Sequence, residues 1–262
     1  MNAKERLIAA LEGRPVDRLP FSPFLAYVWE HFPAEIQEAG QLAFLQEVGA
    51  DPLWRGAPCP VAAIPPSEME TRTTTEGERT TTVIETPVGS LRQVAQQSAV
   101  GNTSFLVEHP LKTEEDYGIR MWIEEHTSLR PDPEAVADHF AGDGREGLSL
   151  GMLIPRGKSA YQWMVEHLVG TEELIYALVD FPETVRSLWE VMVAKDLEAV
   201  RMAVESDYDY FITWEDSSTQ NYSPAQYDTY IGSEIGTWCR LLDEAGKRYI
   251  QHACGHVANL VK

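Results

Sequence analysis

Residues 249–255 read YIQHACG, and this stretch decides how the rest of the chain is interpreted. The segment before it, 241–247, has the pattern of the last turns of a helix ended by a glycine, so we expect a strand to begin at about Arg248. Side chains alternate across a strand, which puts His252 and Cys254 on the same side. An imidazole and a thiolate in this arrangement can bind one metal ion, and they provide two of the three protein ligands that a catalytic zinc usually has.

The same motif also has an explanation without a metal. A His-x-Cys sequence occurs by chance in many proteins, and a buried cysteine is usually a small apolar side chain. Gly255, which lets the backbone turn sharply after the strand, is compatible with both explanations. The surrounding pattern of strands and helices has to decide between a metal site and ordinary packing.

The composition predicts a soluble, cytoplasmic protein with no nucleic-acid or membrane partner. The 262 residues include 41 Asp and Glu against 21 Lys and Arg, and the formal net charge of −20 repels phosphate backbones and anionic membranes. Three cysteines, at positions 59, 239 and 254, are too few and too scattered for a disulfide framework. The sequence has no apolar stretch long enough to span a bilayer, and its N-terminus lacks the apolar centre of a secretory signal.

From Gly147 onward the chain has the order strand, helices, strand, helix, strand. Apolar runs at 147–152 and 208–213 are typical of buried parallel strands. Helical patterns lie between them and before the last strand, at residues 161–169, 172–179, 182–206 and 223–245. This alternation predicts a parallel sheet built from β-α units, and the chain length fits a (β/α)8 barrel of about 250 residues.

The first half of the chain is expected to hold short helices and a polar hairpin. The helical patterns lie at residues 3–11, 34–38, 42–48, 113 onward and 132–140. Threonines alternate along 71–75 and 80–82 on both sides of a turn at 76–79, which predicts an antiparallel hairpin. This hairpin is too polar for a core. We expect it to lie over the rim of the domain and, with a proline-rich loop at 58–66, to shape the mouth of a substrate site.

Polar residues follow two of the predicted strands. Residues 213–221 read TWEDSSTQN, and the second such end carries the His-x-Cys motif. In barrels of β-α units, chemistry takes place at the C-terminal ends of the strands. If these two strands are neighbours, Glu215 or Asp216 comes within reach of the metal or of His252, and both are candidate catalytic residues. The alternative is that the two carboxylates cap a helix or are simply solvated.

Several motifs resemble those of the uroporphyrinogen decarboxylase superfamily. They are ERLIAALEGRPVDRLP at 5–20, TPVGSL at 86–91, EDSSTQ at 215–220 followed by Ser-Pro at 223–224, and AGK at 245–247 before HACG at 252–255. The match runs in order over nearly the whole chain. It implies one α/β domain over residues 1–262, a (β/α)8 TIM-type barrel with an N-terminal helical segment and an inserted β-hairpin.

The superfamily has two main branches, porphyrin decarboxylases that need no metal and corrinoid-dependent methyltransferases that bind zinc. The decarboxylases carry an arginine-rich segment after the first strand and an aspartate at a later strand end, but residues 21–31 contain no Arg and 52–63 no Asp. The methyltransferases carry His-x-Cys and a distant third ligand, usually Cys, and His252 and Cys254 match the first two. The resemblance therefore implies zinc at these residues and a corrinoid (cobalamin) cofactor or corrinoid protein that exchanges a methyl group with a small thiol or methylated donor.

One departure from that branch concerns the end of the chain. The sequence stops at Lys262, before the last strands and the third ligand of the family, so we expect a barrel without its last βα units, completed by a partner chain or by residues absent from this sequence. Fallback ligands are Cys59, Glu215, Asp216 and His256. Uroporphyrinogen decarboxylation and a barrel that binds a corrinoid or small ligand without catalysis remain the alternatives.

Overall fold

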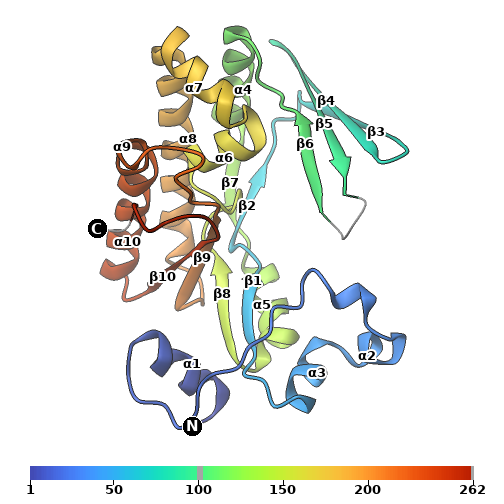
Figure 1. Cartoon of the computed structure of the whole chain (residues 1–262), viewed down its shortest axis with the longest axis vertical. Helices are drawn as coiled ribbons and strands as arrows, with labels where there is room; N and C mark the ends of the chain where they lie inside the picture. Colours follow the sequence, from blue (N-terminus) through green and yellow to red (C-terminus); the bar gives the residue numbers. More distant parts are fainter. Residues whose placement is uncertain (99–102, 261–262) are drawn as a thin grey trace.

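The computed structural model describes residues 1–98 and 103–260, so the predicted truncation point at Lys262 lies outside the described residues. Within them, a four-stranded parallel sheet in the order β1-β8-β9-β10 forms the centre of the molecule (Figure 1). Its strands are β1 (Leu53–Ala57), β8 (Leu148–Met152), β9 (Tyr210–Glu215) and β10 (Arg248–Ala253). The predicted α/β architecture with a parallel sheet is confirmed to this extent.

The two faces of this sheet have different neighbours. Leu150 and Ile212 lie on one face and pack with Leu7 of α1 (Ala3–Leu11). Phe211 lies on the opposite face and belongs to the main core, which the helices build. Because side chains alternate along each strand, this assignment fixes the face of the residues further along β9 and β10.

Helices cover the Phe211 face. The longest is α8 (Pro182–Ala203), which begins with a proline at a position where no backbone donor is needed. Its buried residues recur every three or four positions, as the helical period requires. Beside it, α10 (Ser233–Glu244) contributes Trp238, which is fully buried and packs with its ring centroid 6.0 Å from that of Tyr249 in β10.

The remaining helices agree with the sequence expectations, with two differences. They are α2 (Ala34–Ala39), α3 (Gln41–Glu47), α4 (Glu114–His126), α5 (Pro133–Ala141), α6 (Ala160–Trp163), α7 (Thr171–Asp180) and α9 (Pro224–Gln226). The expected helices at 161–169 and 223–245 are not α-helical throughout, because π-helical turns interrupt them at η3 (Met164–Leu168) and η4 (Tyr227–Gly232). Such wider turns often occur near functional sites, and η3 borders the cavity described below.

The predicted hairpin is present as part of a larger antiparallel sheet. In the described part of the insertion, the strands are β3 (Glu70–Glu76), β4 (Arg79–Thr86), β5 (Gly89–Gln97) and β6 (Ser104–Glu108). Threonine hydroxyls face each other across the hairpin, with 3.1 Å between the Oγ1 atoms of Thr75 and Thr80. The sheet projects from the side of the molecule next to α4 (Figure 1).

The proline-rich stretch 58–66 is not the continuous loop that the sequence predicted. It contains β2 (Val61–Ile64), which pairs antiparallel with β7 (Ser128–Pro131). The prolines of this stretch flank the strand rather than interrupt it, so each residue of β2 keeps its backbone donor. Val61 is buried in the main core, which explains why this short strand forms.

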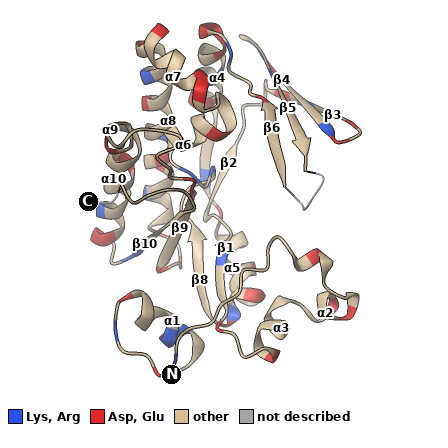
Figure 2. Cartoon of the chain, viewed as in Figure 1, with Lys and Arg blue, Asp and Glu red and all other residues tan. Residues whose placement is uncertain are grey.

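The negative charge of the chain is spread over its surface. Figure 2 shows acidic residues along α2, α4, α7 and α10 rather than in one patch. Among the helices that the structure describes, none combines the length and the apolar character needed to cross a lipid bilayer.

A buried charge network joins the N-terminal helix to the sheet. Asp51, which is 0 % exposed, accepts a hydrogen bond from Arg6 Nη1 at 2.5 Å and one from Arg18 Nη1 at 2.8 Å. Arg6 also donates from Nε to Asp17 at 2.6 Å, and this hydrogen bond holds the pKa of Asp17 well below its usual range. Arg6, Asp17 and Arg18 of the 5–20 motif therefore have a structural role.

Replacing Asp51 with Asn should destabilise the chain. The change leaves two guanidiniums facing a neutral amide, and loss of one partner from a buried ion network costs about 3 kcal/mol. The free energy of unfolding from urea denaturation measures this loss. Glu12→Gln removes an exposed pair with Arg14 and should cost less than about 1 kcal/mol. Equal effects of the two substitutions would contradict the assigned role of Asp51.

Candidate functional site

The His-x-Cys motif lies at the C-terminal end of β10, beside the end of β9. The two strands are parallel neighbours, and His252 pairs with Trp214 in their register. The ring centroids of these two residues are 4.7 Å apart, and Cys254 Sγ donates to Asp216 Oδ1 at 3.1 Å. The predicted adjacency of the two strand ends is therefore confirmed, and it brings His252, Cys254 and Asp216 together.

The loop between β8 and α6 forms the side of this site. Trp214 N donates to Gly157 O at 2.8 Å, and Lys158 Nζ donates back to Trp214 O at 2.7 Å. Lys158 also forms an ion pair with Glu166 of η3 at 2.8 Å. Gly157 has a φ of +71°, a left-handed conformation that favours glycine, so the loop depends on this residue.

The charged residues around the site shift the pKa values of His252 and Cys254 in opposite directions. Partial burial lowers the pKa of His252, and the positive charges of Arg55 and Lys158 lower it further. Partial burial, the hydrogen bond to Asp216 and the charge of that carboxylate raise the pKa of Cys254. At neutral pH the site therefore holds an uncharged imidazole and a protonated thiol.

Gly255 is required for a reason that the sequence did not suggest. Its φ is not positive, but a Cβ atom at this position would lie 2.4 Å from the carbonyl oxygen of Ser217. Contacts of that length between a Cβ and a backbone atom are not tolerated. Glycine therefore allows the chain after Cys254 to pass directly over the loop that carries Asp216.

Glu215 lies away from this group, on the helix-covered face of the sheet. It is the last residue of β9 rather than part of the following loop, and its carboxylate is 0 % exposed. It accepts hydrogen bonds from Ser159 N at 2.7 Å, from Ser159 Oγ at 2.9 Å and from Thr213 Oγ1 at 3.0 Å. Burial raises its pKa to about 7 although these donors act in the opposite direction. Glu215 therefore does not approach His252, in contrast to what the sequence suggested. It contacts Ser159 instead, the residue after Lys158.

Behind Ser159 lies a pair of buried carboxyl groups, those of Glu234 and Asp196. Glu234 Oε2 accepts from Ala160 N at 3.0 Å, and its carboxyl group lies beside that of Asp196. Burial raises the pKa of Glu234 well above its usual range and that of Asp196 to about 6. Arg156 Nε donates to Asp196 at 2.8 Å and pairs with Glu124 at 3.2 Å, so the start of α6 is held by a continuous polar network.

A cavity of about 790 Å³ leads to Asp216. The inserted sheet contributes apolar residues to one wall, including Leu91 and Phe105, and η3 contributes Glu166 and His167 to another. Burial, and then the charge of Lys158, lowers the pKa of His167 to about 4, so this imidazole is neutral at pH 7. The inserted sheet thus lines the cavity that reaches Asp216, whereas no residue of the stretch 58–66, which the sequence analysis expected at this mouth, lines it.

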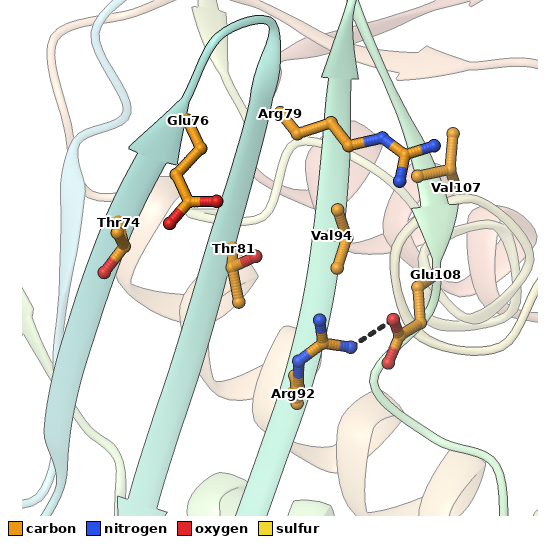
Figure 3. A pocket seen from close by; sticks show the side chains of 8 residues that line it. All are labelled: Thr74, Glu76, Arg79, Thr81, Arg92, Val94, Val107 and Glu108. Atoms are coloured by element: carbon orange, nitrogen blue, oxygen red, sulfur yellow. Dashed lines mark hydrogen bonds and ion pairs between the residues drawn. The ribbon is translucent and has the colours of Figure 1, made fainter.

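A second groove, of about 570 Å³, lies along the inserted sheet (Figure 3). Its two arginines are engaged within the sheet, because Arg92 pairs with Glu108 and Arg79 Nε donates to Gln96 at 3.0 Å. His252, Cys254 and Asp216 are not among its lining residues. We assign this groove no part in the candidate site.

The site offers the kinds of donor atom that zinc binds, but too few of them. His252 offers a neutral imidazole, Cys254 a thiol that loses its proton on metal binding, and Asp216 an adjacent carboxylate. Within residues 1–98 and 103–260, however, no three His, Cys, Asp or Glu side chains lie close enough together to hold one ion. The other fallback ligands are placed elsewhere: Cys59 packs against the main core, Glu215 faces the helices, and His256 is exposed.

The comparison with known proteins gives no match. The sequence matches no protein-family model, and no curated protein matches it. The resemblance to the uroporphyrinogen decarboxylase superfamily is therefore carried by the motifs quoted above.

Three residues at the site were missed in the sequence: Lys158, Ser159 and Arg55. The first two lie in the loop between β8 and α6, so the rule that chemistry lies at the ends of parallel strands, applied to this strand as well, would have pointed to this loop. No sequence pattern points to Arg55, because its importance comes from the lack of a hydrogen-bond acceptor around its Nε in the part of the fold that the structure describes.

Removal of the Asp216 charge should make Cys254 more reactive. In the Asp216→Asn variant the thiol no longer faces a carboxylate, so its pKa falls and more thiolate is present at pH 8. We expect alkylation of Cys254 by iodoacetamide, followed by mass spectrometry, to become several-fold faster. Asp209→Asn, at the other end of β9, should leave the rate unchanged, and an unaltered rate in both variants would refute the contact.

Glu215 should make stability depend on pH. Its folded pKa of about 7 exceeds the unfolded value of 4.5, so protonation stabilises the fold below about pH 4.5 and this contribution is lost as the pH rises through 7. Glu215→Gln should remove up to about 3 kcal/mol of this decline, measured by urea denaturation between pH 4.5 and 8. Glu205→Gln, an exposed control, should retain it; a retained decline in the Glu215 variant would contradict the assignment.

Proposed function

We propose that the chain is a zinc-dependent methyltransferase that moves a methyl group between a corrinoid and a small thiol or methylated donor. The observation that carries the proposal is the arrangement of His252 and Cys254 at the C-terminal edge of a parallel sheet, with Asp216 in contact with the thiol. The order β1-β8-β9-β10 is also what consecutive strands of a (β/α)8 barrel would have, and we propose that larger fold for the domain.

His252 and Cys254 would hold the zinc together with a third donor, which is Asp216 after a small rearrangement or a residue supplied by a partner chain. Bound zinc lowers the pKa of a substrate thiol and so supplies thiolate at neutral pH. Asp216 Oδ1, 3.1 Å from Cys254 Sγ, accepts the proton that this thiol must lose on metal binding. Glu215 acts as a positioning residue, because it holds Ser159 and thereby the neighbouring Lys158.

The corrinoid is the second substrate, presented free or on a corrinoid protein. A corrinoid would supply the methyl group, and the thiol activated at His252 and Cys254 would accept it on sulfur while the electron pair of the broken bond stays with the corrinoid. The cavity of about 790 Å³ between the inserted sheet and η3 offers the approach to Asp216. We also propose a cytoplasmic location, since Cys254 is a free, exposed thiol.

A second candidate function is uroporphyrinogen decarboxylation without a metal. The observation that favours it is the positive charge of Arg55 and Lys158 near His252, which suits a substrate with carboxylates. Against it stands the lack of the family's arginine-rich segment and strand-end aspartate.

Zinc content and methyl transfer test the proposal together. The purified chain should hold about one zinc by elemental analysis, and His252→Ala and Cys254→Ala should each lose it, whereas Cys239→Ala should keep it because that residue packs within α10. With methylcobalamin and 2-mercaptoethanol as probes, absorbance spectra should show consumption of methylcobalamin only in the zinc-loaded chain.

The other outcomes separate the alternatives. Activity retained by both alanine variants at the motif would refute the zinc mechanism. Metal-free turnover of uroporphyrinogen would establish the second candidate function, and corrinoid binding without turnover of either substrate would point to a non-catalytic barrel.

A further inference from the structure

Arg55 is a partly buried cation that has no hydrogen-bond acceptor and no ion pair among the described residues. Its Nε is buried, and none of the residues in the ranges 1–98 and 103–260 accepts a hydrogen bond from it or pairs with its guanidinium. Arg6 and Arg156, by contrast, each bind two carboxylates. A buried donor without an acceptor is unfavourable, so the Nε of Arg55 is a group that a bound ligand can satisfy.

The surroundings of Arg55 are aromatic and lead to the candidate site. The guanidinium carbon lies 4.5 Å from the ring centroid of Phe24, and the Phe24 ring lies 5.7 Å from that of Trp214. Trp214 in turn contacts His252. The charge of Arg55 also reaches that imidazole, whose pKa it lowers.

These residues line a cavity of about 290 Å³. Trp54 adds a third aromatic side chain, and the carboxylate of Asp143, also in the lining, acts on His139 and forms no ion pair with Arg55. The volume is at the lower limit of ligand pockets, which are roughly 300–1,000 Å³. A ligand of this cavity is therefore small.

We propose that this cavity is a binding site for a small, flat carboxylate, with the carboxylate on Arg55 and the apolar body against the aromatic side chains of the lining, Phe24, Trp54 and Trp214. A guanidinium matches the two oxygens of a carboxylate and keeps its charge when partly buried. The aromatic rings favour a planar, apolar body by stacking or edge contacts. The site goes beyond the proposed methyl transfer, since no zinc donor takes part in binding.

Benzoate is the probe that tests this site, with benzamide as its uncharged counterpart of the same shape. The metal-free full chain should bind benzoate saturably, followed by calorimetry and by tryptophan fluorescence, because Trp54 and Trp214 line the cavity. Benzamide should bind at least tenfold more weakly. Because this binding assay uses the metal-free chain, its result does not depend on the zinc mechanism. Each of the two proposals can therefore be refuted without refuting the other.

Substitutions then identify the recognising group. Arg55→Met should weaken benzoate binding at least tenfold while its melting temperature stays equal or rises, because an unpaired cation has been removed; a merely structural arginine would lower that temperature. Arg55→Lys should retain part of the affinity, and Arg79→Met, on the inserted sheet, all of it. Equal binding of benzoate and benzamide, no saturation, or unchanged binding in Arg55→Met would each overturn the proposal.

Discussion

The register between β9 and β10 is the constraint on which the candidate site depends. It sets Trp214 beside His252 and Glu215 beside Ala253, so one face of the strand pair carries the imidazole and the other the buried carboxylate. A slip of one residue would exchange these faces. The hydrophobic pattern of both strands prevents that slip, because Phe211 and its neighbour Tyr249 pack in the helix-covered core, whereas Ile212 and its neighbour Ile250 pack on the face of Leu7. Core packing thus determines which acid can meet the thiol.

Most secondary structure could be predicted from local signals, and the site only in part. Helix α1 and strand β8 follow from apolar spacing, and α4 from the capping box of Thr113 and Asp116. Strand β2 was missed because its partner β7 lies more than sixty residues away, and no local pattern reveals such a pairing. The meeting of Cys254 with Asp216 followed from the strand order. The lack of a hydrogen-bond acceptor for Arg55 Nε among the described residues could not be predicted, because no sequence pattern indicates that a contact is absent.

The family-like motifs carry two kinds of information. In the 5–20 motif, Arg6, Asp17 and Arg18 bind one another or Asp51 and so connect α1 to the sheet. This motif therefore indicates a shared fold and gives no information about the reaction. The HACG motif differs, because His252 and Cys254 project polar groups where core packing requires none. Its glycine is explained by the close approach to Ser217. A resemblance that includes both motifs therefore supports the fold more strongly than the chemistry.

The raised pKa of Glu234 has a consequence for the charge balance of the interior. With this carboxyl group protonated, the guanidiniums of Arg120 and Arg156 balance the carboxylates of Glu124 and Asp196. The interior cluster is therefore electroneutral, and the negative charge of the chain is carried by residues outside it. Dissolved ions screen exposed charges over about 8–10 Å at moderate ionic strength but do not enter such a core. Salt should therefore weaken the interactions of the exposed acidic residues with charged partners more than it weakens the ion pairs within this cluster.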